Sequence, residues 1–195
     1  MKFYIYTLPF ADELKFFKYG RHLTNREKNL LENVRIKFKN FLDTNGIKII
    51  NEIEKFTGIK WFVSNLNIYL VLHFNGLGMF NPFIAKYIKD WDIFIFNNVH
   101  KIVHINFMNP KFQAVKKISK FTKEEVYIKY GLEPVIWLVT CKVLEKILSI
   151  DKVKEIIEKD KKMFDNHCTI WKYVEKLEKE WDLKNKNILF YMKSK

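Results

Sequence analysis

The run Ile68-Tyr69-Leu70-Val71-Leu72-His73-Phe74 says most about the fold. It is rich in β-branched, aromatic and aliphatic residues and is apolar on both faces, which predicts a strand inside a sheet. Residues 59–63 have a similar composition, and Asn75-Gly76 marks a turn after the run. Ile93-Phe94-Ile95-Phe96 predicts either a short strand or the first turns of a helix. Together these segments predict a small sheet over residues 59–96.

Helices are predicted ahead of this sheet, in an N-terminal helical region over residues 1–58. Thr24-Asn25-Arg26-Glu27 matches a capping box, in which the threonine hydroxyl accepts a backbone hydrogen bond and the glutamate carboxylate accepts another. A helix should begin here, and Asn45-Gly46 should stop it. Isoleucines at a helical spacing then predict a second helix over residues 47–58.

More helices are predicted after the sheet. One should run from about Asn98 to Phe107, because Asn97 or Asn98 can cap it and Asn109-Pro110 closes it. Thr122-Lys123-Glu124-Glu125 is a second capping box, and Pro134 suits the first turn of a further helix. The last 45 or so residues predict two amphipathic helices around a break at Asn166-His167.

The composition is typical of a folded protein. Of the 195 residues, 48% are hydrophobic, and only six are glycine and four are proline, so the chain should bury a sizeable core. We expect an α+β fold that forms one domain over residues 1–195. Its consecutive regions are the N-terminal helices (residues 1–58), the small sheet (residues 59–96), the central helices (residues 97–148) and the C-terminal helices (residues 149–195).

The sequence also bears on location. No window approaches the roughly 18 consecutive apolar residues that span a bilayer, and the first residues lack the apolar run of a secretory signal. Cys141 and Cys168 are too few for a disulfide framework, and their spacing does not match a metal knuckle. We therefore expect a cytoplasmic protein with two reduced thiols and no membrane partner.

The net charge of +13 favours an anionic partner, because a basic surface attracts phosphate. Only three of the 35 basic residues are arginine, and this lysine-rich bias is also what an AT-rich genome writes at tolerant surface positions. Binding of nucleic acid is therefore the alternative function. It is expected to be weak, non-specific and sensitive to salt, since lysine charge without stacking aromatic residues gives mainly phosphate contacts.

The segment His100-Lys101-Ile102-Val103-His104 has the most chemical content. Residues four apart on a helix share a face, so two imidazoles at this spacing can converge on one cation. The same two side chains can instead be half-buried histidines that bond to backbone carbonyls. The spacing alone leaves both interpretations open.

With its upstream strand and the Gly76-Leu77-Gly78 loop, this segment resembles the metal-binding helix of the gluzincins. These are the thermolysin-like branch of the zincin metallopeptidases, whose motif is His-Glu-x-x-His with a downstream glutamate ligand. The resemblance covers about residues 60–148. It implies a zincin-like fold, zinc as the cofactor, and His100 and His104 as two of the ligands, with residues 97–148 forming the metal-site helices.

The resemblance implies Glu133 as the third ligand, 29 residues after His104. Pro134 disfavours helical geometry at the residue before it and so places Glu133 at the start of a helix, where its carboxylate can point elsewhere. Glu145 is then the alternative ligand. A carboxylate that only stabilises a helix N-terminus is the other interpretation of Glu133.

Lys101 stands where the family has its general base. An ammonium group cannot accept a proton from metal-bound water, so the resemblance implies a metallopeptidase homologue that keeps a metal site and has lost peptidase activity. Such a protein would act as a binding or regulatory protein for a peptide or protein ligand. A third possibility is an active hydrolase in which Lys101 has a strongly depressed pKa and acts as the base. The long lysine side chain can swing its ammonium group toward solvent.

The other histidines and tryptophans have plainer interpretations. His73 is predicted to be a packed core histidine, and His167 to be incidental. Trp137, Trp171 and Trp181 occur at helical spacing, which predicts core positions rather than a surface on which bases stack.

Overall fold

The computed structural model describes residues 1–8, 23–73, 78–80, 83–113, 131–164, 167–182 and 187–190. The structure mixes helices and strands, in agreement with the predicted α+β class, and it is mostly helical. The chain divides into two compact units. Unit 1 consists of Met1–Ile47 and Val63–Lys101, and unit 2 consists of Lys48–Phe62 and Ile102–Lys195. Helices α2 (Asn25–Thr57) and α3 (Trp91–Phe107) each contribute residues to both units.

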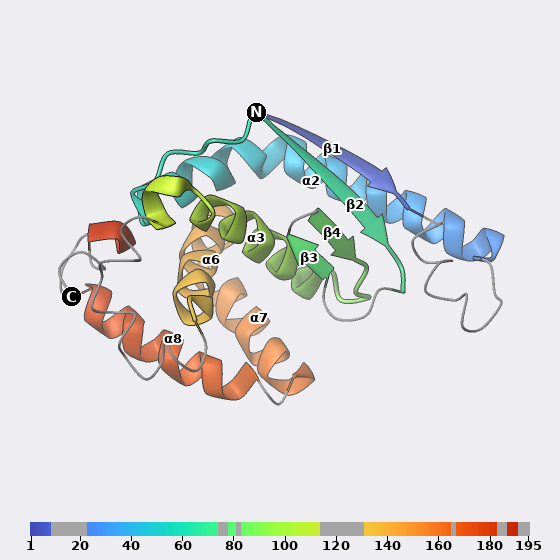
Figure 1. The fold of residues 1–195 in the computed structure, drawn as a ribbon. Coiled ribbons are helices and arrows are strands. Elements are labelled where there is room, and N and C mark those ends of the chain that lie inside the picture. The colour runs from blue at the N-terminus through green and yellow to red at the C-terminus, as the bar shows by residue number, and fades with distance from the viewer. Residues whose placement is uncertain are drawn as a thin grey trace. The chain divides into compact units, whose positions relative to one another are not determined.

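Unit 1 contains one four-stranded sheet with the order β1-β2-β4-β3 (Figure 1). Strands β1 (Lys2–Thr7) and β4 (Phe83–Lys86) both pair in the parallel direction with β2 (Asn65–Val71). The short strand β3 (Gly78–Phe80) pairs with β4 in the antiparallel direction. Strand β2 has a neighbouring strand on each side, so the prediction of a strand inside the sheet is confirmed. The strand begins and ends three residues earlier than the apolar run that predicted it.

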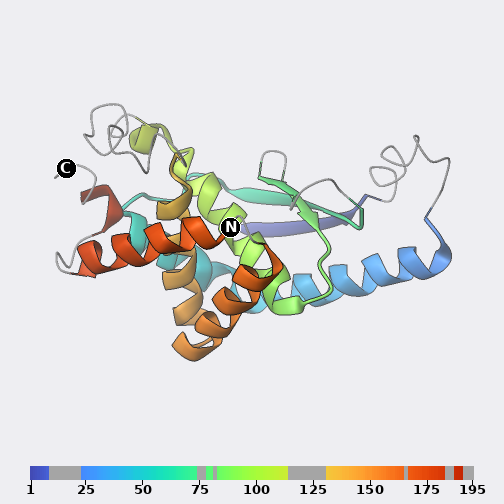
Figure 2. The same ribbon diagram turned by 90° about the horizontal axis from the view of Figure 1, so that it is seen from below.

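One face of this sheet forms the core of unit 1. Along β1, Phe3 and Ile5 are buried, while Lys2, Tyr4 and Tyr6 are exposed. The Phe3 ring lies against Gly46 of α2, and the Phe83 ring of β4 lies 5.9 Å from Nζ of Lys101 on α3. Helices α2 and α3 therefore cover the same face within unit 1, as Figure 2 shows. Along β1, the side chains on the opposite face are exposed.

The prediction that residues 1–58 are helical was wrong at the start of this range, where residues 2–7 form β1. Buried and exposed residues alternate there with a period of two, which is the periodicity of a strand with one covered face. The prediction of two helices was also wrong, because α2 continues through Gly46. The capping box at its start is confirmed: the Thr24 amide donates to the Glu27 carboxylate at 2.8 Å, and the Glu27 amide donates to the Thr24 hydroxyl at 3.2 Å.

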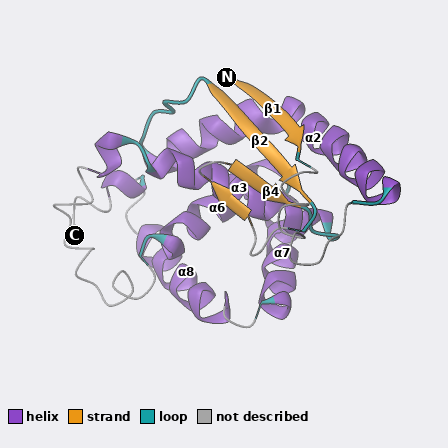
Figure 3. Cartoon of the chain, turned by 45° about the vertical axis from the view of Figure 1, so that its right-hand side comes forward, coloured by secondary structure: helices purple, strands orange, loops and turns teal. Residues whose placement is uncertain are grey.

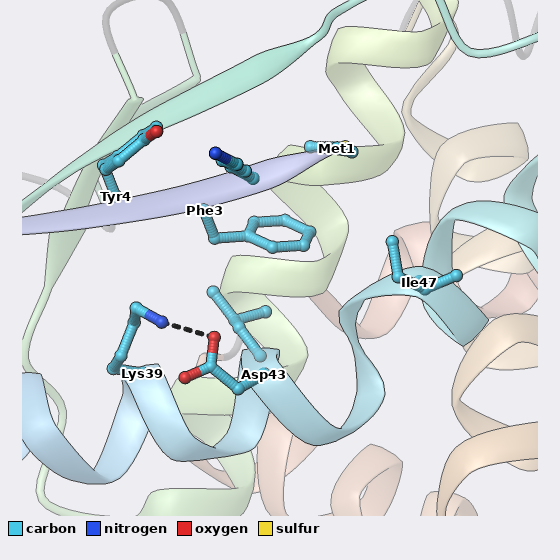
Figure 4. Close-up of a pocket in the computed structure, with 8 residues that line it drawn as sticks. Met1, Phe3, Tyr4, Lys39, Asp43 and Ile47 are labelled. Atoms are coloured by element: carbon cyan, nitrogen blue, oxygen red, sulfur yellow. Dashed lines mark hydrogen bonds and ion pairs between the residues drawn. The ribbon is translucent and has the colours of Figure 1, made fainter.

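Gly46 does not stop the helix, because it makes room for an aromatic ring. A Cβ atom at this position would lie 2.3 Å from the nearest ring carbon of Phe3. Figure 4 shows this ring between β1 and α2, beside the ion pair of Lys39 and Asp43. A glycine inside a helix ordinarily destabilises the helix, and here the close approach of strand and helix explains its presence.

Two boundaries of the predicted sheet also differ from the structure. Residues 59–63 belong to no strand, and Ile93–Phe96 lies inside α3, which begins at Trp91 rather than near residue 98. The carboxylate of Asp90 accepts hydrogen bonds from the backbone amides of Asp92 and Ile93 at 2.9 and 3.1 Å, so Asp90 caps the helix. Because the helix begins at this cap, the predicted end of the sheet at residue 96 falls inside α3.

Unit 2 contains α6 (Glu133–Ile147), α7 (Ile150–Met163) and α8 (His167–Asp182), shown in Figure 3. Helix α6 has Pro134 in its first turn, and α7 and α8 are separated near residue 166, so these predictions are confirmed. The second capping box, at Thr122, lies outside the described residues. In the described ranges, no helix is both long and apolar enough to cross a bilayer.

The contact between Phe3 and Gly46 leads to a prediction about stability. Replacing glycine by alanine inside a helix ordinarily stabilises it by about 1 kcal/mol. Gly46→Ala should instead lower the free energy of unfolding by roughly 1–3 kcal/mol, because the added methyl group overpacks the Phe3 ring. Urea unfolding monitored by circular dichroism measures this change.

The double variant Phe3→Leu, Gly46→Ala serves as the control. Removing the ring should make the alanine harmless or stabilising, relative to Phe3→Leu alone. A stabilising effect of Gly46→Ala in the presence of Phe3 would contradict the close approach of β1 and α2.

Candidate metal centre

The two histidines of α3 are its most accessible positions after the first turn. From Ile93 to Phe107 every residue of the helix is buried except His100 and His104, which are of intermediate exposure. They lie one turn apart on the same side. Burial of the other positions fixes the rotation of the helix, and this rotation leaves both imidazoles at the edge of the core.

Glu133 meets His104 at the start of α6. Its Oε1 atom lies 3.1 Å from Nε2 of His104, and the side chain of His104 is only 14% exposed. Because Pro134 follows, Glu133 is the first residue of α6, as predicted. Its carboxylate does not point elsewhere, however. It faces the histidine, and it lies at a helix N-terminus, where the partial positive charge of the helix attracts a carboxylate.

His100, His104 and Glu133 form a group that could hold a metal ion. Each offers one ligand atom, and these atoms lie within 4.8 Å of one another. Tetrahedral zinc with ligand distances of about 2.0–2.1 Å requires ligand atoms roughly 3.3 Å apart. The His104–Glu133 separation already meets this requirement, and an imidazole rotation can close a wider separation. Two imidazole nitrogens and one carboxylate oxygen are a donor set that suits zinc.

Glu145, the alternative third ligand, lies elsewhere on α6. Its carboxylate is 3.5 Å from Nζ of Lys142, which also pairs with Glu178 of α8. These contacts neutralise Lys142 within unit 2, and Glu145 does not belong to the histidine group. The structure therefore brings together Glu133, and not Glu145, with the two histidines.

A tryptophan holds the second oxygen of Glu133. The indole Nε1 of Trp137, one turn further along α6, donates to Oε2 of Glu133 at 3.2 Å. Trp137 is 5% exposed, and its ring makes an edge contact with Trp171 at 4.6 Å between centroids. The hydrogen bond leaves Oε1 directed at His104. Sequence reasoning placed Trp137 in the core but missed this contact, which its spacing of four from Glu133 could have suggested.

Behind Trp137 lies a buried carboxylate on α7. Asp160 is fully buried, and its Oδ2 accepts a hydrogen bond from Nε1 of Trp171 at 2.9 Å and lies 3.0 Å from Nδ1 of His167. The prediction that His167 is incidental was wrong, because its imidazole is one of the two partners of this carboxylate. A buried polar group needs such partners, so the three side chains hold α7 against α8.

Asn97, a predicted helix cap, lies inside α3. Three residues before His100 and on the same side of the helix, Asn97 is 5% exposed, and its Nδ2 has no hydrogen-bond partner among the described residues.

Lys101 does not reach solvent, contrary to the expectation that its side chain swings outward. It is 5% exposed, its Nζ lies 3.4 Å from Oδ1 of Asn98, and it lies beside the ring of Phe83. Burial penalises the charged form and lowers the pKa of the amine from 10.5 to about 7. The amine is thus buried within unit 1, next to Asn98 and Phe83.

His73 is not a packed core histidine. Its side chain is 33% exposed, and its Nε2 lies 3.2 Å from Oε1 of Glu27, the residue that also closes the capping box of α2. This pair supplies a histidine and a carboxylate of the same chemistry as His104 and Glu133, at a position outside the metal-binding group.

Comparison with other proteins adds no assignment: no protein-family model, no curated protein and no solved structure matches the chain.

The depressed pKa of Lys101 leads to a prediction about pH. The unfolded chain binds the proton up to about pH 10.5 and the folded chain only up to about pH 7, so stability falls as the pH is lowered through this window. Lys101→Met removes the penalty. Its stabilising effect should be largest at or below pH 7 and should shrink by about 2 kcal/mol between pH 7 and pH 9.

Urea unfolding of both proteins at pH 7, 8 and 9 tests this expectation. Lys172→Met, which replaces an exposed lysine of α8, provides the control and should show no such dependence. A constant difference between the Lys101→Met variant and the parent protein over this range would mean that the amine is not buried in solution.

Proposed function

We propose that this protein binds a transition-metal ion, with zinc as the best fit, through His100, His104 and Glu133, and that it acts as a zincin-like binding or regulatory protein without peptidase activity. The single observation that supports this most is the convergence of two imidazoles from α3 and one carboxylate from α6. Three protein ligands leave a fourth coordination position for another group.

One of the three candidate ligands is held in place by a residue that is not itself a ligand. Trp137 fixes the orientation of the Glu133 carboxylate through a hydrogen bond of 3.2 Å. Metal ligands generally depend on such outer partners for their orientation. Burial of the rest of α3 restricts the helix to the rotation that presents both histidines.

The residue that follows His100 in the sequence, Lys101, is the reason to expect no peptidase activity. The zincin mechanism needs a carboxylate there to take a proton from the attacking water. Lys101 occupies that position, and its amine lies among Asn98 and Phe83 rather than at the surface. When bound, zinc would supply a Lewis-acidic position, and the carbonyl or carboxylate of a peptide is a ligand suited to it.

The first test is metal binding by the purified protein. Isothermal titration with Zn²⁺, and the visible absorption of bound Co²⁺, should report one site per chain. His104→Ala and Glu133→Gln should each weaken binding by about 100-fold or more, because each removes a ligand. The protein should remain inert toward casein with zinc present.

The control variant is His73→Ala, which removes a histidine paired with a carboxylate outside the group and should bind zinc normally. Absence of stoichiometric binding by the parent protein, or equal affinity of the His104→Ala variant, would mean that the contact between His104 and Glu133 is purely structural.

The second test concerns the hydrogen bond to Glu133. Trp137→Phe keeps an aromatic ring in the core but removes the indole donor, and it should weaken zinc binding by about 10-fold, as is typical of outer-sphere partners. Trp171→Phe makes the same chemical change in the same cluster but removes the donor to Asp160 instead. It should leave zinc affinity unchanged, and equal losses in both variants would show a general packing effect.

A further inference from the structure

The sheet of unit 1 presents a face that no described helix of that unit covers. This open face is defined by the outward side chains of β1, β2 and β4, which are exposed or of intermediate exposure. They are Lys2, Tyr4, Tyr6, Asn65, Asn67, Tyr69, Ile84 and Lys86. The opposite face carries most of the buried side chains of the same strands, while Val71, which follows Tyr69 in the alternation of β2 and pairs with Lys86, is also buried. The open face is exposed along β1, where Tyr4 and Tyr6 lie.

Aromatic rings are concentrated on this face. Tyr4 is 40% exposed and Tyr6 is 45% exposed, and both belong to the edge strand β1. Tyr6 pairs in register with Tyr69 of β2, and their rings stack at 5.6 Å between centroids with an interplanar angle of 26°. This contact restrains Tyr6, so a further ring that stacked on it would cost less ordering entropy than one that stacked on a mobile side chain.

The polar side chains of the open face match an anionic, hydrogen-bonding partner. Lys2 on β1 and Lys86 on β4 lie near opposite corners of the face. Asn65 and Asn67 belong to β2, the strand between these two. No acidic side chain occurs among the residues that define the face. The chain as a whole carries a net charge of +13.

We propose that the open face binds single-stranded nucleic acid, with bases stacked on Tyr4 and Tyr6 and phosphates held by Lys2 and Lys86. Side chains two residues apart on a strand are roughly 6.6 Å apart, so neighbouring bases of an extended strand can each meet a ring. Exposed aromatic residues on a sheet, flanked by basic side chains, are a general solution for binding unpaired bases.

This surface changes the expectation drawn from lysine charge alone. A duplex hides the faces of its bases, so the tyrosines add affinity only for unpaired strands, while the lysines attract both. The proposal is independent of the metal centre, because its residues come from β1, β2 and β4 and none of them is a proposed ligand.

The test uses the full chain with EDTA present, at 0.15 M salt, and measures fluorescence anisotropy of labelled 12-nucleotide oligo(U), oligo(dT) and a 12-base-pair duplex. We expect at least one single strand to bind ten-fold or more tightly than the duplex, and comparison of oligo(U) with oligo(dT) identifies the preferred source. Tyr4→Ala and Tyr6→Ala should each weaken single-strand binding about 10-fold, while Tyr4→Phe should retain it.

Phe62→Ala is the matched control, since it removes an aromatic side chain that is 49% exposed and lies outside the sheet. Lys86→Gln should lower the salt dependence of binding by about 0.7 in the slope of log affinity against log salt, and the tyrosine variants should leave this slope unchanged. Circular dichroism checks that each variant folds. Equal binding of duplex and single strand, or unchanged binding by both alanine variants, would overturn the proposal.

Discussion

Burial of α3 along almost its whole length constrains the rest of the molecule. Asp90 fixes where this helix begins, and after the first turn only two positions, His100 and His104, are not buried. A helix surrounded in this way cannot rotate about its axis without moving apolar side chains into water. The helix also carries buried polar residues, among them Asn98 and Lys101. The places where it can do chemistry are therefore decided by packing.

The polar groups of unit 2 form a connected series behind one of those places. His104 contacts Glu133, Glu133 accepts from Trp137, and the Trp137 ring lies against Trp171 and His167, which both contact Asp160. Low local polarity strengthens such contacts and makes an unpaired member costly. Each of the three helices α6, α7 and α8 contributes at least one member of the series, and Trp137, which donates to the Glu133 carboxylate, also packs against α8.

Local sequence patterns predicted local structure well and long-range contacts poorly. The apolar run around Ile68 identified the central strand, and Thr24 with Glu27 identified the start of α2, because each pattern acts within a few residues. Gly46 led to a wrong prediction of a helix end, because the glycine is there to make room for the Phe3 ring, 43 positions away in the chain. The same holds for the site: the spacing of His100 and His104 was visible, but the contacts of Glu133 with His104 and of His167 with Asp160 depend on how helices meet. Strand β1 was missed because its period-two pattern was read as belonging to a helical region.

The parallel pairing of β1 with β2 has a consequence for synthesis on the ribosome. Lys2 pairs with Asn65 and Thr7 with Leu70, so the partners are 63 positions apart in the chain. Helix α2, whose hydrogen bonds are local, can form as soon as its residues emerge, whereas β1 must wait until β2 has been made. During that interval its apolar side chains and backbone groups have no native partner. The nascent chain is then most open to misassociation, and an early partner that shields this segment, such as a chaperone, would have its greatest effect there.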